Sequence, residues 1–148
     1  MILADFKAFP RMGRIIGIDW GARRVGVAVS DASREFVFVR PVINVGRGDD
    51  VATIVARCAL DEGVSGIVVG LPLYPDGAES DTTKMVREFI ASLAQKTDLP
   101  IVTVEENLTS VTAQESMGHV RVRDIKEKLD SESARVILEN AIALINRA

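Results

Sequence analysis

The sequence has few of the side chains that enzymes use as nucleophiles or soft metal ligands. Cysteine and histidine occur once each, as Cys58 and His119. One cysteine cannot form an intrachain disulfide, and the two residues are too few for a Cys/His metal site. Because Cys58 lies in the helical apolar pattern of residues 51–60 and His119 lies in a polar stretch, the sequence predicts a helix-core cysteine rather than a catalytic thiol.

Long hydrophobic runs and an excess of positive charge are missing as well. No apolar run reaches the length of a membrane span, and the acidic Asp5 within the first ten residues disfavours a signal peptide. The net charge of −3 disfavours a protein that coats nucleic acid without specificity. The 47% hydrophobic and 26% charged residues are typical of a soluble globular protein, and 148 residues fit a single domain. Together with the missing membrane span and signal peptide, this predicts a cytoplasmic protein with no membrane partner.

Apolar patterns in the first half of the chain predict a strand-rich start. Residues 1–13 are expected to form an irregular leader, and residues 14–148 a single domain. Strands are predicted at 14–19, 24–31 and 35–44, as an antiparallel meander whose first turn is 20–23. Asp49 or Asp50 is expected to cap a helix that ends near Gly63. The all-apolar segment 65–70 predicts a strand buried on both faces, followed by a loop at 71–77.

The second half of the chain continues as alternating helix and strand. A helix is predicted at 79–96, and the fifth strand at 100–106. Thr109 or Ser110 is expected to open a short helix toward Met117, and 119–129 to be a polar mobile stretch before a last helix from Ser131 to about Asn146. The resulting fold class is α/β, with an open five-stranded mixed sheet, helices on both faces, and strands one and four at its centre.

The most informative residue that is present is Asp19, at the end of the apolar strand 14–19. An ionised carboxylate beyond an apolar run is costly unless a cation meets it, and a divalent metal is the usual candidate. Gly17 and Gly21 flank Asp19 and are expected to leave room for a phosphate to approach the backbone. Asp19 is therefore a candidate ligand of a metal at a nucleic-acid site.

Two further carboxylates are candidates for the same site. Glu106 ends the fifth strand, so parallel strands that finish on one edge would place it with Asp19. Asp130 precedes the last helix in the phase of Ala134, on the face expected to be buried. Cleavage of a phosphodiester by a pair of divalent ions needs several such carboxylates from separate elements. The alternatives are that Asp130 is only a helix N-cap and that Glu105 and Glu106 are a solvated strand end.

Four ordered segments make the chain similar to a known family. Residues 17–31, 69–77, 104–110 and 129–138 resemble the successive signatures of the YqgF/RuvX family, and the resemblance runs from about Arg14 to the C-terminus. It implies a ribonuclease H-like fold and metal-binding acids at Asp19, Glu106 and Asp130. It also implies a nuclease that trims the 5′ end of precursor 16S ribosomal RNA, or a Holliday junction resolvase acting on branched DNA.

The resemblance also directs attention to residues that could bind nucleic acid. Asn107 stands where the family has arginine, which removes a fixed positive charge beside the acids. The Gly70-Leu-Pro loop is expected to shape a substrate groove in which Tyr74 stacks on a base or sugar, unless Tyr74 is simply an exposed loop residue. The remaining expected nucleic-acid-binding residues flank the acids in the sequence: Arg23, Arg24, Thr109, Ser110, Arg121, Arg123, Lys126 and Lys128.

The leading hypothesis is a nuclease that uses Mg²⁺ or Mn²⁺ held by Asp19, Glu106 and Asp130, without a protein nucleophile. A non-catalytic module that binds nucleic acid or ribosome precursors is the main alternative, favoured by Asn107 and by the negative net charge. An actin-like phosphotransferase also begins with Gly-Ile-Asp-x-Gly and a hairpin. That class needs two such domains around a nucleotide, and this chain has room for one. Trp20 is expected either in the groove wall or in packing against the sheet.

Overall fold

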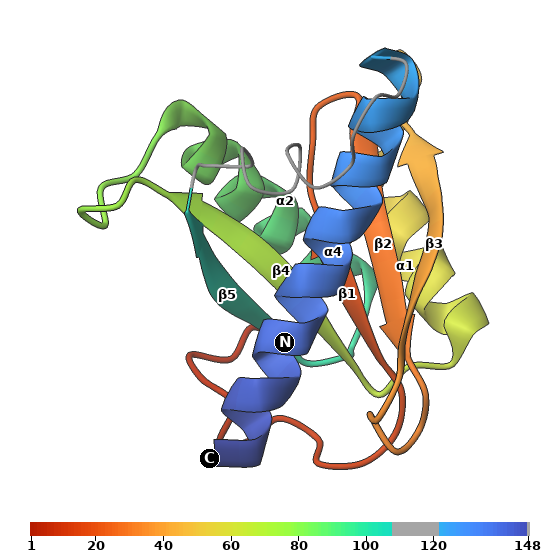
Figure 1. The fold of residues 1–148 in the computed structure, drawn as a ribbon, viewed down its shortest axis with the longest axis vertical. Coiled ribbons are helices and arrows are strands. Elements are labelled where there is room, and N and C mark those ends of the chain that lie inside the picture. Colours follow the sequence, from red (N-terminus) through yellow and green to blue (C-terminus); the bar gives the residue numbers. More distant parts are fainter. Residues whose placement is uncertain (108–121, 148) are drawn as a thin grey trace.

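The computed structural model describes the backbone of residues 1–107 and 122–147, and the side chains of residues 1–106 and 132–147. Its element order is three strands, then alternating helix and strand, then a long last helix (Figure 1). The elements are β1 (Ile15–Asp19), β2 (Arg24–Ser30), β3 (Val37–Asn44), α1 (Val51–Glu62), β4 (Gly66–Leu73), α2 (Asp81–Lys96), β5 (Ile101–Asn107) and α4 (Val122–Arg147). Within these ranges the predicted order of strands and helices is confirmed.

The strands form one mixed sheet in the order β3-β2-β1-β4-β5. β1, β2 and β3 are antiparallel neighbours, whereas β1, β4 and β5 run parallel. The prediction that strands one and four are central is confirmed, because β1 lies between β2 and β4. Ile15, Ile16 and Ile18 of β1 are fully buried, as expected for a strand covered on both faces.

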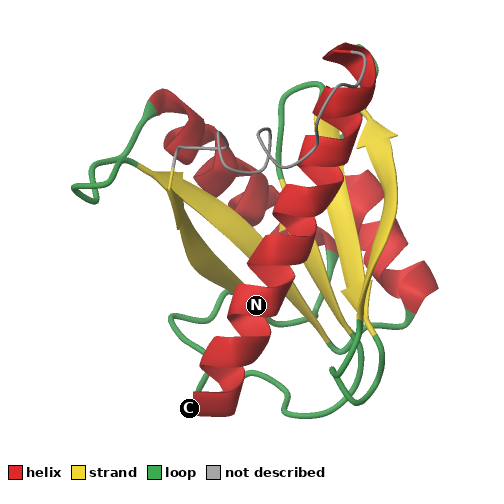
Figure 2. Ribbon diagram, viewed as in Figure 1, coloured by secondary structure: helices red, strands yellow, loops and turns green. Residues whose placement is uncertain are grey.

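Helices cover both faces of the sheet (Figure 2). α1 and α2 pack on one face, over a core that contains Ile16, Ile18 and Val69. α4 crosses the other face and buries Ala134, Ile137, Leu138, Ala141 and Ile145 against it. Two sides of β1 therefore have different surroundings: even-numbered positions face α1 and α2, and odd-numbered positions face α4.

The helix ends follow the expected capping chemistry. Asp50 is the N-cap of α1 and accepts a hydrogen bond from the Thr53 amide, and Gly63 ends this helix with φ at 66°. Ser80 and Thr83 form a capping box at the start of α2. The Thr83 hydroxyl also donates to the Pro72 carbonyl, which fixes the start of α2 to the end of β4.

Two predicted boundaries are wrong. β4 continues to Leu73, where 71–77 was expected to be a loop, because Leu71, Pro72 and Leu73 pair with β5. Proline is tolerated at that point since β1 has already ended and no longer flanks β4. α4 begins at Val122 rather than Ser131, so Asp130 lies inside the helix and is not its N-cap. Residues 122–130 contain neither glycine nor proline, and polarity alone does not break a helix.

Segment 1–13 contains no helix or strand but packs against the sheet. Ile2 forms an isolated bridge with Ile101 of β5, and Phe9 is 2% exposed in the core beneath α4. Arg34 donates from its guanidinium to the carbonyl oxygens of Met12 and Gly13, at 3.2 and 2.9 Å. None of the helices in the described ranges is long and apolar enough to cross a membrane.

Cys58 and Trp20, for which the sequence allowed alternative roles, both pack against the protein core. Cys58 is half-buried on α1, and burial raises the pKa of its thiol, which disfavours the reactive thiolate. The Trp20 ring packs against the α1/α2 core with its centroid 6.5 Å from that of Phe89 on α2. Of the two alternatives for Trp20, the structure favours packing.

Candidate active site

The carboxyl ends of the three parallel strands lie at one edge of the sheet. Ile18 of β1 pairs with Val69 of β4, and Gly70 of β4 pairs with Val104 of β5. Asp19, one residue beyond Ile18, is therefore level with Gly70. Open α/β sheets bind ligands at the carboxyl edge of their parallel strands, so this edge is the candidate site.

Asp19 and Glu106 share the sheet face that α4 covers. Gly17 meets α4 directly, and Asp19 lies two residues further along β1, so both belong to the same side of the strand. Val104 of β5 is buried in the α4-side core, and Glu106 follows it by two residues. The two acids are thus on one face, although their strands are not neighbours: β4 separates β1 from β5.

Gly70 allows Glu106 and Ile137 to approach β4 closely, between the two acids. A Cβ atom placed on Gly70 would lie 2.9 Å from Oε2 of Glu106 and 2.3 Å from Cδ1 of Ile137 on α4. The Glu106 carboxylate therefore leans over β4, on the side toward Asp19. The sequence places Gly70 at the end of the predicted strand 65–70 and at the start of the expected loop, but it does not predict this role, which depends on the pairing of β4 with β5.

The space beside Gly17 and Gly21 does not serve a phosphate, which corrects the sequence prediction. A Cβ on Gly17 would lie 2.9 Å from Cβ of Leu138 and 3.0 Å from the Ala134 carbonyl oxygen. A Cβ on Gly21 would lie 2.4 Å from the Arg24 carbonyl oxygen. Both glycines are needed for close approach of the protein to itself: one at the crossing of α4 over β1, the other in the β1–β2 turn.

The first half of α4 extends toward the same edge (Figure 1). Ala134 packs over Gly17 and Ile137 packs over Gly70, so this side of the helix faces β1 and β4. Asp130 precedes these residues by four and seven positions, which are one and two helical turns. The Asp130 side chain lies outside the described part of the structure. Among the side chains that are described, no three His, Cys, Asp or Glu residues gather closely enough to hold a metal ion.

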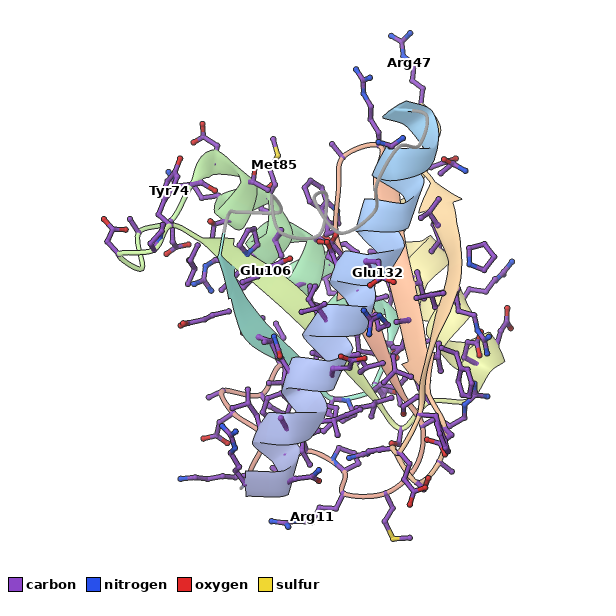
Figure 3. All side chains as sticks on the ribbon, in the orientation of Figure 1. Arg11, Arg47, Tyr74, Met85, Glu106 and Glu132 are labelled. Atoms are coloured by element: carbon purple, nitrogen blue, oxygen red, sulfur yellow. The ribbon has the colours of Figure 1, made fainter. Side chains whose placement is uncertain are left out.

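Glu106 is a half-buried carboxyl group whose environment disfavours its charge (Figure 3). Burial raises the pKa of Glu106 above its ordinary value, and no neighbouring charge contributes among the causes. Within the described residues no hydrogen bond or ion pair to this carboxylate is found. A carboxylate held in this way is stabilised when a cation joins it.

Glu106→Gln is expected to raise the melting temperature of the metal-free protein at neutral pH. Between the unfolded and the raised folded pKa, the folded state holds the extra proton, so the free energy of unfolding falls as the pH rises through this window. Above the folded pKa the loss in the free energy of unfolding has reached its full size. Glutamine carries no charge and therefore avoids this loss. Thermal melts with a chelator present should show an advantage of a few degrees at pH 7 that disappears near pH 4.

Glu105→Gln is the matched control, because Glu105 is exposed and adjacent in β5 but belongs to the opposite side of the strand. It should leave the melting temperature unchanged across the same range. Mn²⁺ should raise the melting temperature of the wild type and of Glu105→Gln, but not that of Glu106→Gln. Equal melting temperatures of wild type and Glu106→Gln at pH 7 would contradict the expectation.

The structure places only some of the expected nucleic-acid-binding residues. Arg24 opens β2 on the side of Gly26, which pairs with Asp19, so it belongs to the α4 face, whereas Arg23 is exposed in the preceding turn. Tyr74 is 49% exposed on the loop that extends beyond β4 (Figure 3). Thr109, Ser110 and Arg121 lie outside the described residues. Arg123, Lys126 and Lys128 belong to the first turns of α4, and their side chains are also outside the described part.

Comparison with known proteins gives a consistent set of similarities. A family model described as "RuvX: Holliday junction resolvase" matches residues 13–143. A protein of Maridesulfovibrio salexigens named "Putative pre-16S rRNA nuclease" is 39% identical over 132 residues, which cover 88% of this chain and 98% of the relative. A protein of Agrobacterium fabrum with the same name is 34% identical over 130 residues, covering 86% of this chain and 82% of the relative.

Solved structures support the fold assignment. Thermus thermophilus RuvC, solved in complex with a Holliday junction substrate, superposes with a TM-score of 0.56 at 12% identity. The similarity covers 91% of this chain and 96% of that one. At this level of identity the likeness concerns the fold, and it confirms the predicted ribonuclease H-like architecture.

Proposed function

The chain belongs to the RuvX family, and from that premise we propose that it is a metal-dependent nuclease that processes the 5′ end of precursor 16S ribosomal RNA. The names of the relatives from Maridesulfovibrio salexigens and Agrobacterium fabrum support this substrate. The family model and the relatives each span most of the chain, so the likeness includes the whole candidate site. Action on a ribosomal precursor would take place in the cytoplasm.

The single observation that carries the chemistry is the approach of Glu106 toward Asp19 across Gly70. Carboxylate oxygens are the donors that Mg²⁺ and Mn²⁺ prefer, and the glycine at position 70 lets the Glu106 carboxylate lie over β4 on the side toward Asp19. The half-buried Glu106 gains a counter-charge when such an ion binds. The residues present therefore fit a divalent metal, with Asp19 and Glu106 as ligands and Asp130 as the third.

Bound at these residues, a pair of divalent ions would supply the positive charge that stabilises the attacking and leaving oxygens of a phosphodiester. The protein's own residues perform the rest. Ile137 and the half-buried Glu106 limit the access of bulk water to the α4 side of Gly70. Arg24 is placed on the same face to bind a phosphate beside the scissile one. α4 fixes position 130 relative to β1 through its contact with Gly17.

Branched DNA is the second candidate substrate, favoured by the description of the family model as a Holliday junction resolvase. A non-catalytic binding module is the third, and Asn107 in place of the family arginine supports it. These candidates differ in which nucleic acid is cut and in whether any is cut, so one paired assay separates them.

The test is a calorimetric titration of wild type and Asp130→Asn with Mn²⁺, run beside cleavage assays. The wild type should bind Mn²⁺ and shorten the 5′ end of a labelled ribosomal precursor faster than it cuts a four-way DNA junction. Asp130→Asn should bind Mn²⁺ at least about tenfold more weakly and lose cleavage. Faster cutting of the junction would support the resolvase, and tight RNA binding without cleavage at any Mn²⁺ concentration would support the binding module.

A further inference from the structure

Charges of opposite sign flank the candidate site along the carboxyl edge of the sheet. The β1–β2 turn and the segment after β3, residues 20–24 and 44–50, contain three arginines and two acids. The loop between β4 and α2, residues 74–80, together with Asp81 contains three acids and no basic residue, and one of these acids, Glu79, forms an ion pair with Arg87 of α2. In Figure 1 the two flanks lie on opposite sides of the edge, since β3 and β5 are the outer strands.

Arg47 stands at the tip of a tight turn on the basic flank. The Asp49 amide donates to the Gly46 carbonyl at 3.1 Å, and Gly48 has a φ of 87°, which is the geometry of a type II turn with Arg47 at its first corner. The Asp49 carboxylate accepts from the Gly46 amide at 2.6 Å. This turn holds Arg47 in an exposed position.

The Arg47 turn is joined to the turn that follows Asp19. The Val45 amide donates to the Arg23 carbonyl at 2.8 Å, and Asn44 pairs with Arg24. β3 is two strands from β1, a lateral distance of about 10 Å. Arg47 therefore lies a few nucleotides from Asp19 on any strand laid across the edge.

Arg47 and Arg23 differ from the four arginines of the described surface that pair with glutamate. Arg14, Arg40, Arg87 and Arg135 each form an ion pair with a glutamate. Neither Arg23 nor Arg47 has an ion pair within the described residues. Exposed guanidinium groups without carboxylate partners are available to bind phosphate.

We propose that Arg47, with Arg23, binds the phosphates of the nucleic acid on one side of the cut, so that the substrate enters over the β1–β2 and β3–α1 turns and not over the β4–α2 loop. Phosphate binding supplies affinity and register without sequence selection. The acidic β4–α2 loop repels a second phosphate backbone, which makes the binding surface one-sided. This inference rests on the proposed function, because it assigns part of the substrate contact of the same site.

Fluorescence anisotropy with a labelled RNA helix that carries a 5′ single-stranded extension tests the proposal. Binding is measured with a chelator present, from about 50 to 200 mM KCl. Arg47→Ala should weaken binding by about 3- to 10-fold and lower the slope of log K against log salt by about 0.7–0.9. Arg47→Lys should keep most of the wild-type affinity and most of the wild-type salt slope. With Mg²⁺, Arg47→Ala should raise KM and leave kcat nearly unchanged.

Two matched variants serve as controls. Arg11 lies at the opposite end of the long axis from Arg47 (Figure 3), and Lys84 is exposed near the start of α2, on the acidic flank. Arg11→Ala and Lys84→Ala should bind as the wild type does. An equal loss for Arg47→Ala and Arg11→Ala overturns the role of Arg47, and an equal loss for Lys84→Ala overturns the one-sided surface. A wild type that binds no RNA contradicts the proposed function itself.

Discussion

Asp19→Asn is expected to reduce metal-dependent cleavage by at least about a hundredfold while the protein stays folded. Asp19 ends β1 on the α4 face, level with Gly70, where the approach of Glu106 provides a second ligand. Asparagine keeps the shape of the side chain but removes the charge that a hard divalent cation requires. Substitution of residues that only support metal ligands already lowers metal affinity or activity by about 10–100-fold, so loss of a ligand is expected to have at least that effect. Single-turnover cleavage of a labelled RNA measures the effect.

Asp61→Asn is the control for this prediction. Asp61 is an exposed carboxylate on α1, on the opposite face of the sheet from α4. It should keep wild-type cleavage and wild-type metal affinity. If Asp19→Asn cleaves at the wild-type rate in Mg²⁺, the acids at this edge do not form the site.

Gly17→Ala is expected to destabilise the protein by about 1–3 kcal/mol and to lower cleavage together with stability. The added methyl would lie 2.9 Å from Cβ of Leu138 and 3.0 Å from the Ala134 carbonyl oxygen. Neither atom is the end of a flexible side chain, so α4 itself must move away from β1. Because α4 carries position 130, its displacement also separates that position from Asp19.

Chemical denaturation gives the free energy of unfolding for this comparison. Ala143→Ser serves as the control, because Ala143 is exposed on α4 and is not part of the core that this helix buries against the sheet. Its free energy of unfolding is expected to differ from that of the wild type by no more than about 0.5 kcal/mol. Wild-type stability in Gly17→Ala would mean that α4 is held less tightly to the sheet than these distances require.

Much of the fold can be predicted from the sequence because its strands have unambiguous apolar patterns. The continuous apolar runs of β1 and β4 predict central strands, and their residues are buried on both faces. The start of α4 was missed because charged residues dominate 122–129, although Val122, Ile125 and Leu129 have the i, i+3, i+7 spacing of a helix. The end of β4 was missed because proline suggests a loop, and only the early end of β1 makes Pro72 acceptable there.

The candidate site is less accessible to sequence reasoning than the fold. Strand ends indicate Asp19 and Glu106, since their positions depend only on where apolar runs stop. The part played by Gly70 depends on the register of β4 with β5, and that of Arg47 on the contact between two turns distant in sequence. Both are properties of tertiary structure. The assignment of Asp19, Glu106 and Asp130 as metal ligands stays a prediction that the experiments above address.

The unequal lengths of β1 and β4 have an evolutionary consequence. β1 stops at Asp19, whereas β4 continues past Gly70 to Leu73 and only then gives rise to its loop. Insertions or deletions in residues 74–79 can therefore accumulate without shifting the backbone that carries the acids. The length and charge of this loop can thus change while Asp19 and Glu106 keep their relative positions.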